Sequence, residues 1–321
     1  MEPAERGLGG ERRPAGKRSD EGLGVLAAIL SSSVGGITTA VTRYVIGATD
    51  PVTLAGMRFG LGFLLLVPIA LALRSRWPRR EDWLGVALLG ILFFAVFFGL
   101  FNLALKYTSA ARGALGVSTL PLMTMLVASA LRVERLTKRK SAGVLIAIAG
   151  VAVALVAGLG DAPQGAWRGD AIMVAATLCF ALYSIWSRPF IARSSPLGFV
   201  AASMGCGSFV VCLPALAGGG FARTSDFGAG QWTAVVYLVV FGAALTFYLW
   251  VFALAHTTPT KVTNTITLNP VMASIVATYL VGEPIGLYLL VGIAAVFAGI
   301  LIASTDRSAA PQKAAAGQAS R

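Results

Sequence analysis

The chain has 321 residues, of which 56% are hydrophobic and only 12% are charged, and its mean hydropathy is +0.78. A soluble globular protein carries roughly 25% charged residues, so this composition excludes a soluble enzyme, a nucleic-acid-binding domain and a disordered chain. The net charge of +12 does not change that conclusion, because most Lys and Arg residues lie in short segments between apolar runs. We therefore predict an all-α integral membrane protein, since the apolar runs are too long for the strands of a barrel.

The apolar runs predict ten transmembrane helices, each long enough to cross a hydrocarbon core of about 30 Å. They cover residues 22–42, 51–73, 83–105, 109–131, 141–158, 169–187, 196–217, 231–255, 260–280 and 285–304. The polar stretches 1–21 and 305–321 are expected to be disordered tails. The first run is expected to be a retained span rather than a cleaved signal, because a long charged stretch precedes it.

Basic residues alternate between loops. The N-terminal tail and residues 74–80 and 132–140 are rich in Arg and Lys, whereas the loops between them hold little more than Arg43, Lys106 and Arg168. Because basic loops remain in the cytoplasm, we expect both termini to be cytoplasmic, loop 159–168 to be outside, and the protein to lie in a bacterial inner membrane. The three cysteines are in apolar runs without a CxxC pair, and no metal site, disulfide or cofactor is expected.

The two halves of the chain are related in sequence. Residues 103–154 align without gaps to 252–303, with 13 of 52 positions identical, including a proline, an acid and two glycines. The starts of the halves also match, at an offset of 145 instead of 149. We predict one membrane domain made of a first five-helix repeat, 22–158, and a second, 169–304. Five spans per half makes the repeat inverted, which is typical of alternating-access transporters.

Several motifs in this repeat resemble those of a known family. The pair Arg58-Phe59, the sequence LALKYTSA before the fourth span, and Glu134 followed by Gly143 and Gly150 are similar to the EamA-type drug/metabolite transporters. Within that superfamily the chain is most similar to the YddG-type exporters of aromatic amino acids. The resemblance implies a ten-helix bundle, a central cavity lined mainly by spans 1, 3, 4, 6, 8 and 9, and export from the cytoplasm.

Polar residues form stripes on two of the predicted spans. In the first span they recur at spacings that fall on one helical face, as Ser32, Gly36, Thr39 and Arg43. In the ninth span the stripe is Thr260, Asn264, Thr267, Ser274 and Thr278. From these stripes we predict that Ser32, Asn264, Thr267 and Ser118, the repeat mate of Thr267, contact the substrate. The alternative is that they only join helices.

Prolines interrupt the fourth and ninth spans at equivalent positions. Pro121 and Pro270 each remove a backbone N–H and obstruct the bond to the residue four before, which is expected to expose the carbonyls of Val117 and Ile266. We predict that both prolines act as hinges. The alternative is a tolerated kink whose carbonyls bond to neighbouring hydroxyls.

Aromatic residues concentrate in spans 3 and 8. We expect most of them to face lipid or to pack between helices; they are Phe93, Phe94, Phe97, Phe98, Phe101, Tyr237, Phe241, Phe247, Tyr248 and Trp250. A flat substrate is predicted to stack on Phe98, beside Asn102, and on Tyr248. Tyr183 and Trp186 are expected to add a polar-tipped pair in the sixth span.

Ionisable residues restrict the mechanism, because no Asp or Glu lies in the central third of any span. Arg58, two turns into the second span, is expected to extend its charge to the membrane surface, which leaves a cavity without buried charge. Such a cavity suits a neutral or zwitterionic solute moving by facilitated diffusion. Glu134 and Glu283 are expected to cap helices, and Gly56 and Gly60 to pack against another helix.

These features predict a transporter whose partners are a small molecule, an amino acid or amphipathic metabolite, and the lipid bilayer, with no nucleic acid and a monomer sufficient for function. Within that class the alternative is a broad-specificity drug or lipophilic-cation exporter. An intramembrane enzyme is a distant alternative, because it needs a Ser–His pair, paired aspartates or a metal, and the one histidine, His256, is at a helix end. An inverted repeat gives no advantage to a receptor or scaffold.

Overall fold

The computed structural model describes residues 15–131, 138–157, 164–257 and 259–304, and within these ranges every regular element is a helix. Eight helical segments are long and apolar enough to cross a membrane: Asp20–Ile46, Pro51–Ala72, Arg80–Tyr107, Ala110–Ala130, Ala166–Arg193, Pro196–Ala217, Ala229–His256 and Lys261–Val281. Two further apolar stretches, Ser141–Val153 and Leu287–Gly299, are shorter. All ten overlap the predicted runs. Glu134 lies outside the described residues.

Several of these segments are divided into shorter helices. The first half contains α1 (Ala15–Ile46), α2 (Pro51–Ala72), α3 (Trp83–Gly90), α4 (Phe98–Tyr107), α5 (Ala110–Val117), α6 (Leu120–Ala130) and α7 (Lys138–Ala157). The second half contains α8 (Ala166–Trp186), α9 (Arg188–Arg193), α10 (Pro196–Ala217), α11 (Ala229–Val239), α12 (Thr246–His256), α13 (Pro259–Asn264), α14 (Leu268–Val281) and α15 (Leu287–Ser304). Short 3-10 turns lie at η1 (Arg80–Asp82), η3 (Gly220–Asp226) and η5 (Thr265–Thr267).

Equivalent caps begin the second helix of each half. Asp50 accepts hydrogen bonds from the backbone N–H groups of Val52 and Thr53 at 3.0 and 2.9 Å, and Pro51 follows it at the first helical position. Partial burial raises the pKa of Asp50, but the hydrogen bonds from Thr53 and Val52 outweigh this effect, and the net pKa lies below its usual value. In α10, Ser195 accepts from the Gly198 N–H before Pro196 in the same way. Each cap contributes about 1 kcal/mol to its helix.

Two spans are interrupted by π-helical segments. These are η2 (Ile91–Phe97), between α3 and α4, and η4 (Val240–Leu245), between α11 and α12. They start 149 positions apart, which is the offset of the sequence alignment. Single π turns inside α-helices are frequent at functional positions, because they change which carbonyls and side chains face inward.

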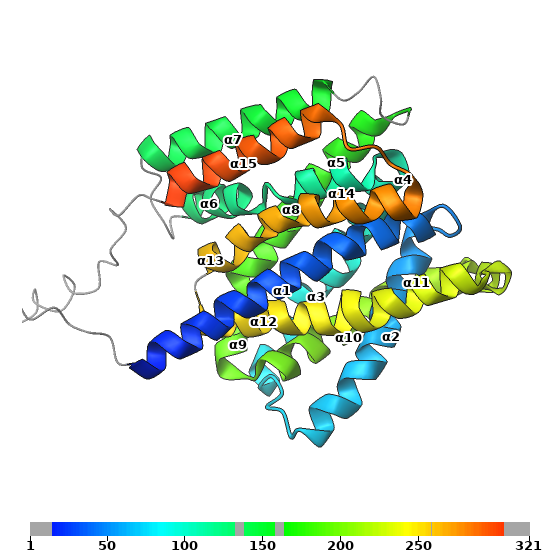
Figure 1. The fold of residues 1–321 in the computed structure, drawn as a ribbon. Coiled ribbons are helices and arrows are strands. Elements are labelled where there is room, and N and C mark those ends of the chain that lie inside the picture. Colours follow the sequence, from blue (N-terminus) through cyan, green and yellow to red (C-terminus); the bar gives the residue numbers. More distant parts are fainter. Residues whose placement is uncertain (1–14, 132–137, 158–163, 258, 305–321) are drawn as a thin grey trace, which may run out of the picture.

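Helices from the two halves pack against each other across the bundle (Figure 1). In the first half α1 packs against α12 and α14, and in the second half α8 packs against α4 and α6. The pairs α2 with α10 and α7 with α15 also join the halves. α7 and α15 lie side by side at one edge in Figure 1. The first span of each half therefore lies between elements of the other.

Glycines permit the closest of these approaches. A Cβ on Gly36 of α1 would lie 2.6 Å from the carbonyl oxygen of Asn269 in α14, and a Cβ on Gly90 of α3 would lie 2.1 Å from that of Ser203 in α10. A Cβ on Gly56 or Gly60 would lie 3.4 or 3.3 Å from Sγ of Cys212 in α10, so this glycine pair packs against that helix with less crowding. Cys212, Cys179 and Cys206 are free and half-buried.

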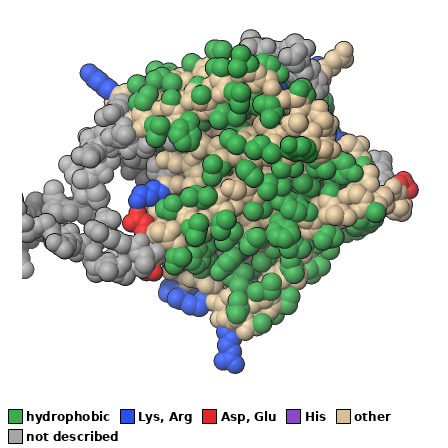
Figure 2. Space-filling model, in the orientation of Figure 1, with side chains coloured by type: hydrophobic (Ala, Val, Ile, Leu, Met, Phe, Trp, Pro, Cys, Tyr) green, Lys and Arg blue, Asp and Glu red, His purple; other side chains and the backbone are tan. Residues whose placement is uncertain are grey.

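The outer surface is strongly apolar. Figure 2 shows hydrophobic side chains covering most of the visible face, with Lys, Arg, Asp and Glu at its margins. Exposed large residues include Leu64, Leu84, Phe209, Tyr279 and Leu287. A surface of this kind needs an apolar solvent, and together with the eight long apolar helices it identifies a multi-pass membrane protein.

Candidate functional site

A small cavity lies inside the bundle, where helices of both halves meet. Its volume is about 50 Å³, room for one or two water molecules at about 30 Å³ each. It is lined by helices of spans 1, 2, 3, 4, 6, 8 and 9. Six of these are the spans that the family resemblance implies, and the second span is additional. The lining residues used below are Ser31, Ser32, Gly35, Thr38, Thr39, Arg58, Phe98, Thr246 and Asn269.

Arg58 of α2 brings a positive charge into this cavity wall. The residue is only 2% exposed, and its Nη2 donates a 2.5 Å hydrogen bond to the carbonyl oxygen of Gly242 in η4. The guanidinium carbon lies 4.9 Å from the ring centroid of Phe59 and 4.7 Å from that of Phe98. Nε and Nη1 have no hydrogen-bond partner among the described residues.

The predictions that Arg58 reaches the membrane surface and that the cavity holds no buried charge are therefore wrong. The physical reason is the packing of α2, which places this face against α4 and η4 instead of lipid. Gly242 has no side chain, so the guanidinium can approach its carbonyl closely.

Hydroxyl groups of α1 join it to the second half. Ser32 Oγ and Thr265 Oγ1 are 2.7 Å apart, and Ser31 Oγ donates to the carbonyl oxygen of Thr246 at 2.8 Å. These bonds link the polar stripe of α1 to the breaks in the eighth and ninth spans. Asn269 lies beside them, 5% exposed, and its Oδ1 has no partner among the described residues.

Phenylalanine rings of the third span fill the space behind the cavity. Phe93, Phe94, Phe97, Phe98 and Phe101 are all at most 4% exposed, and they stack on one another and on Phe180, Phe247 or Tyr183. These five rings pack between helices and not against lipid, which is one of the two outcomes expected for the aromatic residues. Spacings of one and four residues place all five on one broad face.

The cavity includes two of the predicted substrate residues, Ser32 and Phe98. Asn102 is buried, and its Nδ2 donates to the Pro51 carbonyl oxygen at 3.0 Å, which ties α4 to the start of α2. Tyr183 is fully buried and stacks on Phe93 with ring centroids 4.1 Å apart. Trp186 is exposed, so it does not pair with Tyr183. Tyr248 is half-buried and lies outside the lining.

The ninth span presents a different face to the cavity from the predicted stripe. Ile266 and Asn269 line it, whereas Asn264 and Thr267 do not. Asn264 is half-buried, and Thr267 Oγ1 donates to the Asn264 carbonyl oxygen at 2.9 Å. The 3-10 turn η5 separates α13 from α14, so a single helical projection does not describe this span.

Both predicted breaks are present just before the prolines. α5 ends at Val117 and α6 begins at Leu120, one residue before Pro121, while η5 precedes α14 and Pro270. Neighbouring hydroxyls take up carbonyls at the break in the fourth span: Ser118 Oγ donates to Leu115 and Thr119 Oγ1 to Gly116. Ser118 is thus buried and bonded within its own turn.

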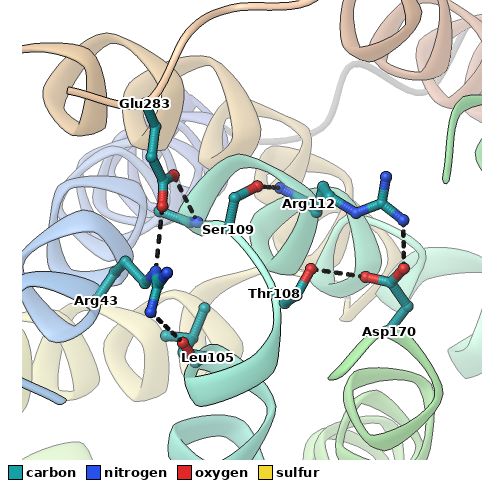
Figure 3. Close-up of polar contacts among 8 residues, drawn as sticks. Arg43, Leu105, Thr108, Ser109, Arg112, Asp170 and Glu283 are labelled. Atoms are coloured by element: carbon teal, nitrogen blue, oxygen red, sulfur yellow. Dashed lines mark hydrogen bonds and ion pairs between the residues drawn. The ribbon is translucent and has the colours of Figure 1, made fainter. Parts of the chain in front are cut away.

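Ion pairs join the two halves near the end of α1 (Figure 3). Arg43 Nε lies 3.1 Å from Glu283 Oε1 and its Nη1 donates to the Leu105 carbonyl oxygen at 3.0 Å. Glu283 Oε2 accepts from the Ala110 N–H at 2.9 Å, so it caps the first turn of α5 as predicted for this residue. Arg112 pairs with Asp170 at 2.5 Å.

Ion pairs also join the halves at the end where α1 begins. Arg193 Nη2 lies 2.5 Å from Asp82 Oδ1, and Lys261 pairs with Glu21. Each of these contacts, like the two at the other end, connects the first half of the chain to the second. His256 is exposed at the end of α12 and stacks on Phe252.

Comparison with known proteins identifies the family. The model of the EamA-like transporter family matches residues 22–156 and 167–305. The chain belongs to the EamA-like transporter family. Among similar proteins, the "Probable terminal-alkyne amino-acid exporter" of Streptantibioticus cattleyicolor is 30% identical over 251 residues, which are 75% of this chain and 82% of the relative. The "Uncharacterized transporter YyaM" of Bacillus subtilis is 27% identical over 84% of this chain and 89% of its own length.

A solved crystal structure supports the fold of this EamA-like transporter. It is 22% identical and covers 89% of this chain and 96% of the other, with a TM-score of 0.64. The likeness demonstrates a shared architecture, while the family and its similar proteins identify a transporter.

Six polar or charged residues of the cavity wall in this EamA-like transporter lie outside the set predicted to contact substrate: Ser31, Thr38, Thr39, Arg58, Thr246 and Asn269. Arg58 was noticed but assigned to the surface, and Asn269 was not selected. A useful signal was available for Arg58, because an ionisable residue well inside an apolar span more often faces the bundle interior than lipid. Asn269 directly precedes Pro270, where the helical pattern changes.

Proposed function

We propose that this protein is an alternating-access exporter of small neutral or zwitterionic metabolites, with aromatic amino acids as the best-fitting class. The observation that carries the proposal is the small polar and aromatic cavity between the two halves, together with ion pairs that join the halves near both ends of α1. A cavity of about 50 Å³ is too small for an amino acid. Substrate must therefore enter when one end opens and leave when the other does.

The proposed architecture is ten transmembrane helices in two inverted five-helix repeats, 22–158 and 169–304, which form one domain in the inner membrane. It is supported by the two ranges of the family match, by the equal offset of η2 and η4, and by the equivalent packing of α1 and α8. Both termini are proposed to be cytoplasmic. The test is a Gly165→Cys variant with the native cysteines replaced; labelling by an impermeant maleimide only from the cytoplasm would reject this topology.

The substrate class follows from the cavity wall. Phe98, Phe247 and Trp250 offer aromatic faces, and hydroxyl and amide groups offer hydrogen bonds. Arg58 disfavours the alternative of a lipophilic-cation exporter, because a like charge in the cavity wall repels the substrate. The similar exporter from Streptantibioticus cattleyicolor is named for an amino acid, which agrees with this choice.

Roles for the remaining residues are part of the proposal. Ser32 and Phe98 line the cavity and are proposed to touch the substrate there. Asn102, Ser118, Tyr183, Tyr248, Asn264 and Thr267 lie outside that lining, so any contact they make with substrate requires a more open state. Pro121 and Pro270 are proposed as the hinges.

The decisive experiment is counterflow in liposomes that contain the purified full chain. Liposomes loaded with unlabelled phenylalanine are expected to take up labelled phenylalanine without any ion gradient, because facilitated diffusion moves the substrate without a coupled ion. A pH gradient alone should not drive accumulation above equilibrium. Absence of exchange with every amino acid, together with exchange of lipophilic cations, would refute the proposed substrate class; uphill uptake that a protonophore abolishes would refute the mechanism.

A further inference from the structure

We propose that Arg58 and Asn269 form a head-group site for a zwitterionic α-amino acid, in which Arg58 binds the carboxylate and Asn269 Oδ1 accepts from the ammonium. The inference rests on the proposed function and deepens it, since it names the groups that recognise the substrate class. The head group is common to all α-amino acids, so these two residues recognise the class of substrate and not its side chain.

Arg58 has the free donors that a carboxylate needs. A guanidinium carries five N–H donors in a planar fork that matches the two carboxylate oxygens. One nitrogen is used by the Gly242 carbonyl, while Nε and Nη1 are buried without partners among the described residues. Phe59 and Phe98 pack against the guanidinium and fix its plane, but they leave the N–H edge free. None of the ion pairs formed within the described ranges includes Arg58.

The structural repeat does not explain this charge. At the offset of 145 the mate of Arg58 is Ser203, whose hydroxyl bonds to carbonyl oxygens within its own helix. An arginine needed only for packing between α2 and its neighbours would be expected in both halves. A buried cation without a counter-charge is expensive in a membrane and is typically functional.

Asn269 supplies the complementary acceptor. Its Oδ1 is buried without a partner in the described part of the chain, and it faces α1 at Gly35, where a Cβ would lie only 3.1 Å from that oxygen. A primary ammonium has three donors and no acceptor, so an amide oxygen is a suitable partner. Ser32 and Thr39 line the same wall of α1 and can bond to the remaining N–H groups.

The separation of the two groups suits a single head group. Asn269 faces α1 at Gly35. Thr38, one turn further along α1, packs against Gly242 and therefore lies beside the guanidinium of Arg58. One turn rises about 5 Å. The ammonium nitrogen and carboxyl carbon of an α-amino acid are about 2.5 Å apart, and with a hydrogen bond of about 3 Å at each end one head group reaches up to about 8 Å, enough to join groups set one turn apart along α1. The aromatic rings behind the site must then move to admit the side chain.

The test compares three competitors of phenylalanine counterflow by the full chain in liposomes. These are phenylalanine itself, its methyl ester, which lacks the carboxylate, and 3-phenylpropionate, which lacks the ammonium. The wild type should prefer phenylalanine to the ester by at least about tenfold, because the ester leaves the buried guanidinium unpaired. It should also prefer phenylalanine to 3-phenylpropionate.

Matched variants separate the two ends of the site. Arg58→Gln should reduce the preference for acid over ester to within about twofold while the preference over 3-phenylpropionate remains, and Asn269→Leu should do the reverse. Arg58→Lys keeps the charge but loses the fork and should retain part of the acid preference, so it replaces Arg58→Gln if that variant does not fold. Arg80→Gln, at the exposed start of η1, is the control and should change neither preference.

The results separate this inference from the proposed function. Amino-acid exchange in which the ester competes as well as the acid, or in which Arg58→Gln and Arg58→Lys keep the full preference, overturns the head-group site and leaves the transporter assignment intact. A wild type that exchanges no amino acid overturns the proposed substrate class and the site with it. The site is supported if Arg58→Gln loses only the preference over the ester and Asn269→Leu loses only the preference over 3-phenylpropionate.

Discussion

The strongest test of alternating access is to break the ion pair between Arg43 and Glu283 near the end of α1. Glu283 links Arg43, at 3.1 Å, to the first N–H group of α5, at 2.9 Å from Ala110. Both bonds connect the second half of the chain to the first, so they must break when this end opens. The substitution Glu283→Gln removes the charge and keeps the shape.

The structure sets the size of the effect. A hydrogen bond to a charged group contributes about 1.5–3 kcal/mol and a neutral one about 1 kcal/mol, and an anion at a helix N-terminus adds about 0.5 kcal/mol. The side chains of Arg43 and Glu283 are 22% and 14% exposed, so solvent screens the pair only partly. We expect Glu283→Gln to weaken the closed state by about 2–3 kcal/mol. That corresponds to roughly 30- to 150-fold and would raise an open population of about 1% to between roughly 25 and 60%.

Thiol labelling measures this population. Thr39 lines the cavity one turn before Arg43 on α1, so a Thr39→Cys variant without the native cysteines reports access from that end. Glu283→Gln should accelerate its reaction with an impermeant maleimide at least tenfold. Glu81→Gln is the matched control, because the Arg79–Glu81 pair is exposed and local and such pairs contribute about 0–1 kcal/mol. Equal labelling rates in a folded Glu283→Gln variant would refute the reasoning.

Three further predictions concern other parts of the bundle. Arg112→Met should lower the free energy of unfolding by about 3–5 kcal/mol, because Asp170 loses its partner in a pair whose side chains are 5% and 10% exposed. Thermal unfolding in detergent of Arg112→Met, of Asp170→Leu and of the double variant should show strongly non-additive losses. Additive losses would contradict a direct pair. Gly90→Ala should cost about 1–3 kcal/mol, because its Cβ would lie 2.1 Å from a backbone oxygen of α10, and an unchanged melting temperature would show that the helices separate easily. Pro121→Ala and Pro270→Ala should extend their helices through the breaks and change labelling from the two sides in opposite directions; a hinge role fails if stability is normal and both rates are unchanged.

The sequence alone determined the class of fold because the relevant signals are local. Apolar runs of sufficient length must be helices in a membrane, and each of the ten apolar helical segments in the described residues overlaps a predicted run. Proline removes a backbone donor wherever it occurs, so the breaks before Pro121 and Pro270 were predictable. The two π-helical segments lie outside the aligned residues, yet they keep the offset of 149 between the halves.

Only the tertiary structure decided which side chains face inward. In a soluble protein an apolar stripe marks the buried face, but in a membrane lipid and helix interior are equally apolar. Hydrophobic periodicity therefore could not direct Arg58 to Gly242, distinguish the Asn269 face from that of Asn264, or separate buried Tyr183 from exposed Trp186. The ion pair of Arg43 with Glu283 joins residues 240 positions apart, and its partners become neighbours only because α1 packs against α14 of the other half.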